Sequence, residues 1–292
     1  MSRTAHSSTP PYWTLSRGIM AKAATLDPSQ DAERYIVPGL QRGLQILRAF
    51  DRQRLQLGAP EIARELGIPR STVFRLMQTL EYMGLLEKVD HSSEYRLGIG
   101  VLSLGFEYLA SMEVTELARP ILDRLRDDTG FSSHLAIRDG SNIVFVVKSA
   151  AKAAFASSVT IGTRFPAHAT ILGRVILADL TDSELQGIYL TGKLSRYSDQ
   201  TPETLSALKK ILEEDDTRGY AMSAAYFEHG IGSIAAPVRD SSGRVIAAIN
   251  IIFQDGKVEK EQYVDRVLQA ASDLSRQLNY HPAVNKQERH TG

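Results

Sequence analysis

The chain has 292 residues, of which 43% are hydrophobic and 23% are charged, and this favours a folded protein of about two domains. No apolar run approaches the roughly 18 residues that a membrane-spanning helix needs, and the absence of cysteine excludes a disulfide framework, a thiolate zinc site and a cysteine nucleophile. The 34 basic and 34 acidic residues cancel, which argues against a chain that coats nucleic acid along its whole length but not against one basic module. We expect a cytoplasmic protein that does not enter the membrane.

Residues 1–34 are dominated by Ser, Thr, Pro and Ala and lack a sustained apolar face, which predicts a disordered extension. No apolar segment follows the first arginine, so these residues do not resemble a signal peptide. Met20 is an alternative start to Met1, because every segment with a folded pattern follows it. At the other end, residues 282–292 are polar and predict a frayed tail.

Two short helices joined by a tight turn are predicted within residues 59–80. Pro60 and Pro69 stand where a helix begins, since proline tolerates the first turn and lacks an N–H that would have no partner there. Gly67 falls between the two helical patterns, where glycine can adopt the left-handed conformation that ends a helix.

The second of these helices, residues 69–80, is amphipathic. Its apolar face consists of residues spaced at i, i+3, i+4 and i+7, namely Val73, Leu76, Met77 and Leu80. The opposite face offers hydrogen-bonding groups without a carboxylate, from Arg70, Ser71, Thr72, Arg75 and Gln78. Such a helix suits the major groove of DNA, although by itself it is equally an ordinary solvated helix.

The flanking segments favour the DNA-binding interpretation. A first helix is predicted over residues 38–52, with a core stripe of Leu40, Leu44 and Leu47 that Phe50 extends. Strands over residues 84–89 and 94–97 surround the polar turn of residues 90–93 and predict a hairpin. Three helices followed by a hairpin make a winged helix-turn-helix, which we assign to residues 35–98. Ten basic and seven acidic residues lie between positions 34 and 97, an excess of the right sign.

A connecting helix is predicted over residues 99–119. Pro120 fits the first turn of a further helix, which would open a second domain over residues 120–281. The connecting segment has more apolar residues than one packed face needs, among them Val101, Leu102, Leu104 and Leu109. This excess predicts a dimer contact.

The second domain alternates strands and helices. Strands over residues 133–138 and 143–148 flank a hairpin turn at residues 139–142, and a third strand is expected over residues 155–161. Further strands are predicted over residues 219–225, 231–238 and 244–253, and helices over residues 169–180, 181–190, 202–217 and 258–278. Antiparallel pairings with helices between them predict an α+β fold.

Common enzyme signatures are missing from the sequence, including the Walker loop, the GxSxG elbow and metal-ligand spacings such as HExxH. Gly230 and Gly232 form a lone GxG, which we interpret as a bend or bulge. Glu228 and His229 form a polar pair that we interpret as structural or pocket-lining rather than as a catalytic dyad. We therefore expect no catalytic residue, no metal and no cofactor.

A small-ligand pocket is the favoured interpretation of residues 162–174, which lead from a loop into the start of a helix. Backbone N–H groups and the positive end of the helix dipole attract carboxylates there. His134, on the first strand, could supply a proton-tunable donor. Small side chains on neighbouring strands would leave space for a ligand, namely Ala225, Ser233, Ala235 and Ala236. The alternative is that these small residues only let helices pack close to the sheet.

In order and spacing, the motifs over residues 37–280 resemble the IclR family of bacterial transcriptional regulators. The landmarks of the first domain are Leu44-Gln45-Ile46-Leu47, Glu61-Ile62-Ala63, Ser71-Thr72-Val73-Phe74-Arg75-Leu76 and Tyr95-Arg96-Leu97-Gly98. Those of the second are His168-Ala169-Thr170, Gly173-Arg174, Gly219-Tyr220-Ala221 and Gly232-Ser233-Ile234-Ala235-Ala236-Pro237-Val238. The resemblance implies a winged helix-turn-helix, a linker helix and a GAF-like effector-binding domain with an antiparallel sheet. It also implies dimers, often paired into tetramers on DNA.

Residues 162–167 and 173–178 are similar to the branch of this family that regulates aromatic catabolism through the protocatechuate and β-ketoadipate route. That resemblance implies an effector that is an aromatic acid or a dicarboxylate of the β-ketoadipate type. The candidate effector-binding residues are His134, His168, Thr170, Ile171, Leu172, Ala225, Ser233 and Ala235. Residues 224–229 depart from the acidic run that is usual in the branch, and they border the family's pocket.

The expected partners are double-stranded promoter DNA, a small carboxylic-acid effector and a second copy of the chain, with RNA polymerase as a further candidate. The candidate DNA-binding residues are Arg42, Arg70, Ser71, Thr72, Arg75, Gln78, Lys88, His91 and Arg96. Two alternatives stay open. One is a regulator that senses a non-aromatic keto acid such as glyoxylate or pyruvate. The other is a small-molecule enzyme or sensor whose helix-turn-helix docks a protein.

Overall fold

The computed structural model describes residues 35–51, 53–151, 159–224, 230–254, 256 and 259–281. The chain divides into two compact units, Met1–Leu104 and Gly105–Gly292, and each is described by itself. Within the described ranges, no helix is both long enough and apolar enough to cross a membrane. The fold combines an N-terminal helix-turn-helix unit with a C-terminal unit of mixed α and β structure, as the sequence predicts.

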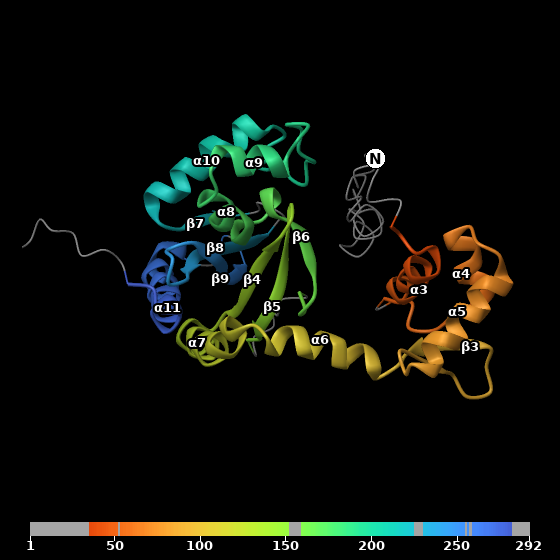
Figure 1. Cartoon of the computed structure of the whole chain (residues 1–292). Coiled ribbons are helices and arrows are strands. Elements are labelled where there is room, and N and C mark those ends of the chain that lie inside the picture. The colour runs from red at the N-terminus through yellow and green to blue at the C-terminus, as the bar shows by residue number, and fades with distance from the viewer. Residues whose placement is uncertain are drawn as a thin grey trace, which may run out of the picture. The chain divides into compact units, whose positions relative to one another are not determined.

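Over residues 35–51 and 53–97, the first unit contains three helices and a small sheet (Figure 1). The helices are α3 (Pro38–Ala49), α4 (Ala59–Leu66) and α5 (Arg70–Tyr82). The strands β1 (Leu57–Gly58), β2 (Leu86–Lys88) and β3 (Glu94–Leu97) pair antiparallel in the order β1-β3-β2. The hairpin of β2 and β3 is the predicted wing, whereas β1 is too short to give a periodic signal in the sequence.

The turn between α4 and α5 follows the predicted design. Gly67 has φ 65°, the left-handed conformation, and its N–H donates to the carbonyl of Ala63. The face of α5 that carries Val73 and Met77 is fully buried against the other helices. The helix-turn-helix is thus fixed by one left-handed glycine and one apolar stripe.

The predicted core stripe of the first helix is wrong at Leu40 and Leu44, whereas Leu47 and Phe50 pack in or against the core as predicted. Leu40 and Leu44 are 65% and 52% exposed, and the residues that face the core are Gly43, Ile46, Ala49 and Phe50. The error arises because the buried face of α3 is rotated away from Leu40 and Leu44, toward Gly43, Ile46 and Ala49. The helix also ends earlier than predicted, at Ala49, because Phe50 is already extended.

The connecting segment consists of two helices, α6 (Gly100–Ala110) and α7 (Glu113–Thr129). Pro120 lies inside α7 and does not begin a helix, which corrects the sequence prediction. The helix starts at Glu113 instead, and the acidic Glu113 and Glu116 in its first turn complement the helix dipole. The buried side chains that flank Pro120 hold α7 against the sheet, so that packing outweighs the hydrogen bond the proline cannot donate.

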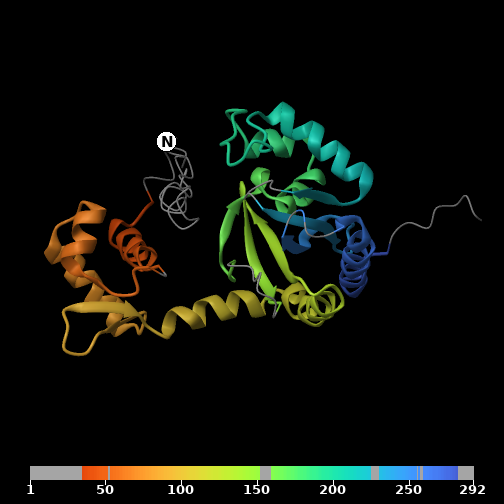
Figure 2. The same ribbon diagram turned by 180° about the vertical axis from the view of Figure 1, so that it is seen from behind.

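The second unit is built on a six-stranded antiparallel sheet of order β6-β5-β4-β9-β8-β7. Its strands are β4 (Ser132–Asp139), β5 (Asn142–Ser149), β6 (Arg164–Pro166), β7 (Ala221–Ala224), β8 (Ile231–Arg239) and β9 (Val245–Gln254). The helices α8 (Ile171–Ala178), α9 (Asp182–Ile188) and α10 (Leu205–Arg218) lie on one side of the sheet (Figures 1 and 2). The helices α7 and α11 (Val264–Gln277) lie on the other.

Two boundaries of this unit differ from the prediction. The expected strand over residues 155–161 lies partly outside the described residues, and its described part, residues 159–161, is loop and turn. The strand that pairs with β5 on the side away from β4 is β6, which follows residue 161 in the chain. The long helix expected over residues 258–278 is shorter, since a 3-10 turn at Lys260–Tyr263 precedes α11.

Each face of the sheet has its own apolar core. Ile249 and Ile251 of β9 pack beneath α7 and α11, while Ala248 packs beneath α8. We call the side covered by α8 the α8 face. On this side Arg174 of α8 and Asp215 of α10 form a buried bidentate ion pair, with two N–O distances of 2.6 Å. This geometry gives the guanidinium two charge-assisted hydrogen bonds and holds the two helices together.

Gly230 lies in a turn with φ 80°, as expected of a bend, whereas Gly232 lies within regular β8 pairing and is neither a bend nor a bulge. A Cβ at this position would come within 2.2 Å of the ring of Phe253, which is itself 1% exposed. The glycine is therefore required because the phenylalanine ring lies directly over its Cα.

Gly232→Ala is expected to destabilise the protein by about 1–3 kcal/mol, because the buried ring must move. Thermal unfolding of the full chain measures this as a lower Tm. Gly187→Ala is the matched control, since a Cβ at Gly187 in α9 would have no atom within 4 Å, and alanine favours the helix there. Equal Tm values for the two variants would contradict the steric argument.

Candidate functional site

The exposed face of α5 carries most of the side chains that the sequence singled out. Arg70, Ser71, Arg75 and Gln78 are exposed and Thr72 is half-buried. The first turn of α5 contains no acidic residue and no capping side chain. Within the described ranges, neither Arg70 nor Arg75 is paired with a carboxylate, so both guanidinium groups can meet an anion or a base edge without breaking an ion pair.

Gln78 is engaged inside the unit. Its Nε2 donates to Tyr95 Oη of β3 at 2.7 Å and to Glu81 Oε2 at 2.9 Å. These bonds tie α5 to the wing, so a contact between Gln78 and DNA would use the remaining carbonyl oxygen. Phe74, which the sequence reasoning placed only within a family motif, is 51% exposed between these polar residues. Its position one turn after Arg70 is the signal that could have identified it.

The wing presents a mixture of free and paired charges. Lys88 and His91 are exposed, and His91 adopts the left-handed conformation, with φ 57°, in the turn between the strands. Arg96 is bound by its cross-strand partner Glu87, at 2.9 Å between Nη2 and Oε2. Arg42 lies half-buried on α3. Lys88 therefore offers a positive charge more readily than Arg96 does.

A chain of hydrogen bonds crosses three neighbouring strands on the α8 face. Ser233 Oγ donates to the carbonyl of Ile251 at 3.0 Å, and Asn250 Nδ2 donates to Ser233 Oγ at 2.9 Å. Asn250 Oδ1 lies 3.0 Å from Nδ1 of His134. We call these groups the polar chain. Ser233, Asn250 and His134 are all buried, at 9%, 4% and 1% exposure.

The direction of every bond in the polar chain follows from its end at Ile251. A carbonyl only accepts, so the single hydroxyl proton of Ser233 points to Ile251, and Ser233 must accept from the amide NH₂ of Asn250. Asn250 then presents its oxygen to His134, and Nδ1 of His134 carries the ring proton. Nε2 of a neutral His134 is consequently an acceptor with a lone pair.

The ring of His134 is held neutral by its surroundings. Burial lowers the pKa of His134 to about 4, an effect that the Asn250 bond partly offsets and that the charge of Lys148 reinforces. Nε2 has no hydrogen-bond partner among the described residues. Leaving such an acceptor buried and unpaired costs about 1–3 kcal/mol.

His168 has a different environment from His134. Its Nε2 donates to the carbonyl of Ser195 at 2.9 Å, and its ring contacts Tyr189 edge-on. Burial lowers its pKa as well. His168 therefore holds the loop that carries Ser195 in place through this hydrogen bond.

The start of α8 provides the backbone groups that the sequence predicts. Thr170 caps the helix by accepting from the N–H of Gly173 at 3.1 Å. The first-turn amides of Ile171 and Leu172 have no acceptor within the helix. Both side chains are buried, and they share a cluster with Phe145, whose ring meets that of His134 edge-on at 5.5 Å. His134 thus lies on the same side of the sheet as the start of α8.

The other pocket candidates are placed as follows. Ala235 is fully buried under α8 within the apolar cluster, the arrangement expected of a small residue that lets a helix approach the sheet. Ala225 lies outside the described residues, as do Glu228 and His229. Sequence reasoning missed Asn250, although an asparagine in the apolar run of residues 245–253 was a visible signal.

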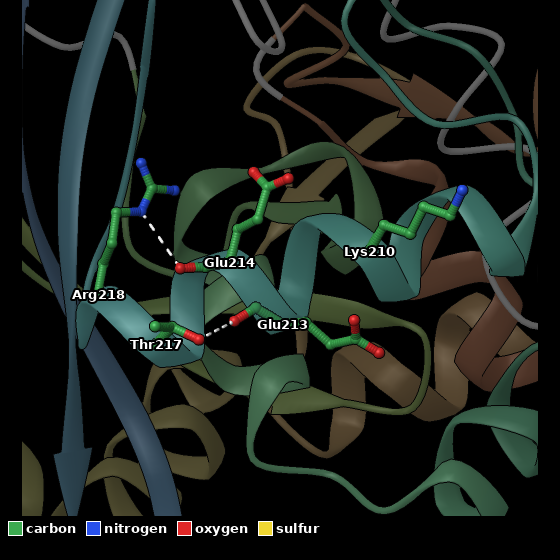
Figure 3. Close-up of a pocket in the computed structure, with 5 residues that line it drawn as sticks. All are labelled: Lys210, Glu213, Glu214, Thr217 and Arg218. Carbon is green, nitrogen blue, oxygen red and sulfur yellow. Dashed lines mark hydrogen bonds between the residues drawn. The ribbon is translucent and has the colours of Figure 1, made fainter.

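A separate hollow lies on the outer surface of α10 and is lined by Lys210, Glu213, Glu214, Thr217 and Arg218. Figure 3 shows that these side chains come from successive turns of this one helix. Thr217 donates to the carbonyl of Glu213, and Arg218 Nε donates to that of Glu214. This hollow is thus the solvated face of a helix, and none of the residues predicted to bind a ligand lines it.

The depressed pKa of His134 predicts a loss of stability in acid. Below pH 6.5 the unfolded chain takes up a proton that the folded chain refuses, so stability falls until about pH 4 and is then constant. The shift corresponds to roughly 3 kcal/mol. Urea unfolding at pH 7 and pH 4.5 should show a smaller loss for His134→Phe than for the parent. The control His281→Phe, at an exposed position, should lose as much stability between pH 7 and pH 4.5 as the parent does. An equally unchanged loss in His134→Phe would contradict the assignment of the acid sensitivity to His134.

Comparison with known proteins gives the same result for both units. Residues 106–280 match the family model described as bacterial transcriptional regulator IclR C-terminal, and residues 39–90 match the IclR helix-turn-helix domain. The HTH-type transcriptional regulator XynR of Escherichia coli K12 is 32% identical over 84% of this chain and 98% of its own. The Pca regulon regulatory protein of Pseudomonas putida is 29% identical over 95% of this chain and 94% of its own.

A solved structure of a protein described as a transcriptional regulator, from Rhodococcus sp. RHA1, is 31% identical with a TM-score of 0.75 and covers 84% of this chain and 99% of its own. The matches cover the helix-turn-helix, the connecting helices and the whole sheet-containing unit. The chain therefore belongs to the IclR family of bacterial transcriptional regulators.

Proposed function

We propose that this regulator binds promoter DNA as a homodimer or tetramer, with α5 in the major groove, and that a small carboxylic acid bound on the α8 face controls it. The effector class is an aromatic acid or a dicarboxylate of the β-ketoadipate type. The protein acts in the cytoplasm by binding alone, with no catalytic step, and RNA polymerase is the partner that it meets at the promoter. The observation that carries the DNA-binding part is the exposed pair Arg70 and Arg75 on α5, to which the described residues supply no carboxylate partner.

Three features support the effector class. The first-turn amides of α8 favour a carboxylate. The apolar cluster of Phe145, Ile171 and Leu172 lies beside them, as an aromatic or aliphatic acid requires. The relative from Pseudomonas putida is named for the pca regulon, whereas other relatives are named XynR and AllR. The keto-acid alternative is therefore tested beside the aromatic one.

The connecting helix supports a dimer. Every described side chain of α6 is at least partly exposed, and the large apolar ones are Leu102, Leu104, Phe106 and Tyr108, each more than half exposed. A helix that is apolar and accessible all round needs a partner surface. The same helix in a second copy is the partner that we propose.

A route from effector to linker is short in this fold. His134 on β4 faces α8, and its neighbour Ser133 donates across the opposite face to the carbonyl of Leu122 in α7, at 2.8 Å. A bound acid that shifts β4 therefore acts on α7 directly. It alters DNA binding only to the extent that it binds the two arrangements of the dimer with different affinity.

Arg75→Ala and Lys88→Ala distinguish base readout from charge. If Arg75 contacts a base, its loss lowers affinity for operator DNA by about 1–3 kcal/mol and reduces the discrimination against random DNA. Lys88→Ala should weaken binding to both sequences and reduce the salt slope by about one ion-equivalent. Fluorescence anisotropy at several salt concentrations measures both effects.

Lys210→Ala on α10 serves as the control for lost positive charge, and it should change neither quantity. Equal loss on both DNAs for Arg75→Ala would make Arg75 a phosphate contact. Failure of the parent to shift DNA from upstream of its own gene would favour the protein-docking alternative.

Thermal unfolding with protocatechuate, 4-hydroxybenzoate, β-ketoadipate and glyoxylate tests the effector class. An acid that binds only the folded state stabilises it by mass action and so raises Tm. At a concentration one hundred times Kd, the free energy of unfolding increases by about 2.7 kcal/mol. We expect an increase with an aromatic acid or β-ketoadipate. An increase with glyoxylate alone would select the keto-acid alternative, and no increase with any acid would contradict the proposed class.

A further inference from the structure

The lone pair of His134 Nε2 is a recognition element in its own right. The two ring nitrogens point to different sides of the ring, so Nε2 faces away from Asn250, which holds Nδ1. Nε2 is completely buried, and the described part of the chain supplies no donor to it. Buried polar atoms in native proteins nearly always have partners, and an exception on the α8 face indicates a group that is supplied from outside.

The neighbours of the ring do not provide that group. Lys148 is the register partner of His134 on β5, and its ammonium donates to the carbonyl of Val159 at 2.6 Å. Phe145 presents its ring edge-on to His134 and has no polar hydrogen to donate. Since no described residue donates to Nε2, we assign the donor that completes His134 to a bound molecule.

We infer that His134 selects effectors that carry a hydroxyl or another O–H or N–H donor in addition to their carboxylate. This inference rests on the proposed function, and it deepens that proposal by naming a second group of the effector. It also reverses the role expected from the sequence, in which His134 donates to a carboxylate. A hydroxy acid satisfies both the amides at the start of α8 and the lone pair of His134, whereas an acid with only acceptors leaves Nε2 unpaired.

The polar chain is what gives His134 this selectivity. Because Ser233 donates to the carbonyl of Ile251, the amide of Asn250 cannot turn round without placing its oxygen against an oxygen that has no proton to offer. Ser233 is therefore a positioning residue. The hydroxyl of Ser233 fixes the orientation of the Asn250 amide, and that amide fixes the tautomer of His134. In this tautomer Nε2 can pair only with a hydrogen-bond donor.

Isothermal titration calorimetry of the full chain with matched acids tests the inference. 4-Hydroxybenzoate carries a hydroxyl donor where 4-fluorobenzoate carries a fluorine, which can only accept. Lactate and pyruvate make the same comparison without an aromatic ring, since lactate has a hydroxyl where pyruvate has a carbonyl. In whichever pair binds, we expect the hydroxy acid to have an affinity at least about tenfold higher than its acceptor-only counterpart. This ratio is the effect of leaving one buried acceptor unpaired.

Two variants sharpen the test. In His134→Phe the ratio between the two acids of the pair should fall toward one while the carboxylate contacts remain. Ser233→Ala frees the amide of Asn250 to turn and should also lower the ratio, whereas Ser242→Ala, in the exposed turn before β9, should preserve it. Circular dichroism establishes that each variant is folded.

Equal affinity of the parent for both acids of a pair would overturn the inference and leave the proposed effector class standing. An unchanged ratio in a folded His134→Phe variant would also overturn it. If neither pair binds and no acid of the thermal unfolding series raises Tm, the proposed effector class fails, and the inference that rests on it fails with it.

Discussion

The carbonyl oxygen of Ile251 sets the polarity of the α8 face. It can only accept a hydrogen bond, and from that single fact the proton positions of Ser233, Asn250 and His134 follow in sequence. The three side chains stand on β8, β9 and β4, which are adjacent in the sheet. A polar chain of this kind in an apolar core is stable only when each donor meets an acceptor, and here every internal bond is made. The unmet group is at the end of the chain, on His134.

The rest of the second unit holds this chain in place. The buried bidentate pair of Arg174 and Asp215 joins α8 to α10, and Arg218 pairs with the same carboxylate. Gly173, next to Arg174, allows the backbone at Ala167 to approach, since a Cβ would come within 2.1 Å of that carbonyl oxygen. The start of α8 is therefore fixed against the sheet that carries His134.

The sequence predicted the parts of the fold in which one pattern has no competitor. Gly67 and the apolar stripe of α5 indicated the helix-turn-helix, and the hairpin turns indicated the pairing of β4 with β5 and of β8 with β9. The stripe of α3 was wrong at Leu40 and Leu44, because tertiary packing decides which part of the helix's apolar surface is buried. Pro120 failed because the packing of α7 on the sheet overrides a local propensity.

Site residues were harder to predict than elements, for a physical reason. His134 is a ligand-binding candidate by its residue type and strand position, but its role depends on which nitrogen carries the proton. That depends in turn on Asn250 and Ser233, which lie far away in the chain and meet His134 only through sheet pairing. Similarly, the pairing of Arg96 with Glu87 and of Gln78 with Tyr95 depends on the wing's register, which residue types alone do not reveal.

The tautomer of His134 is the property that tests the polar chain most directly. Long-range proton–nitrogen correlation NMR on the full chain, labelled with ¹⁵N-histidine, distinguishes a protonated ring nitrogen from one with a lone pair, and the His134→Phe variant assigns the signals. The polar chain predicts, at neutral pH and without ligand, a protonated Nδ1 and an unprotonated Nε2. A protonated Nε2 with a lone pair on Nδ1, or a doubly protonated ring, would contradict it.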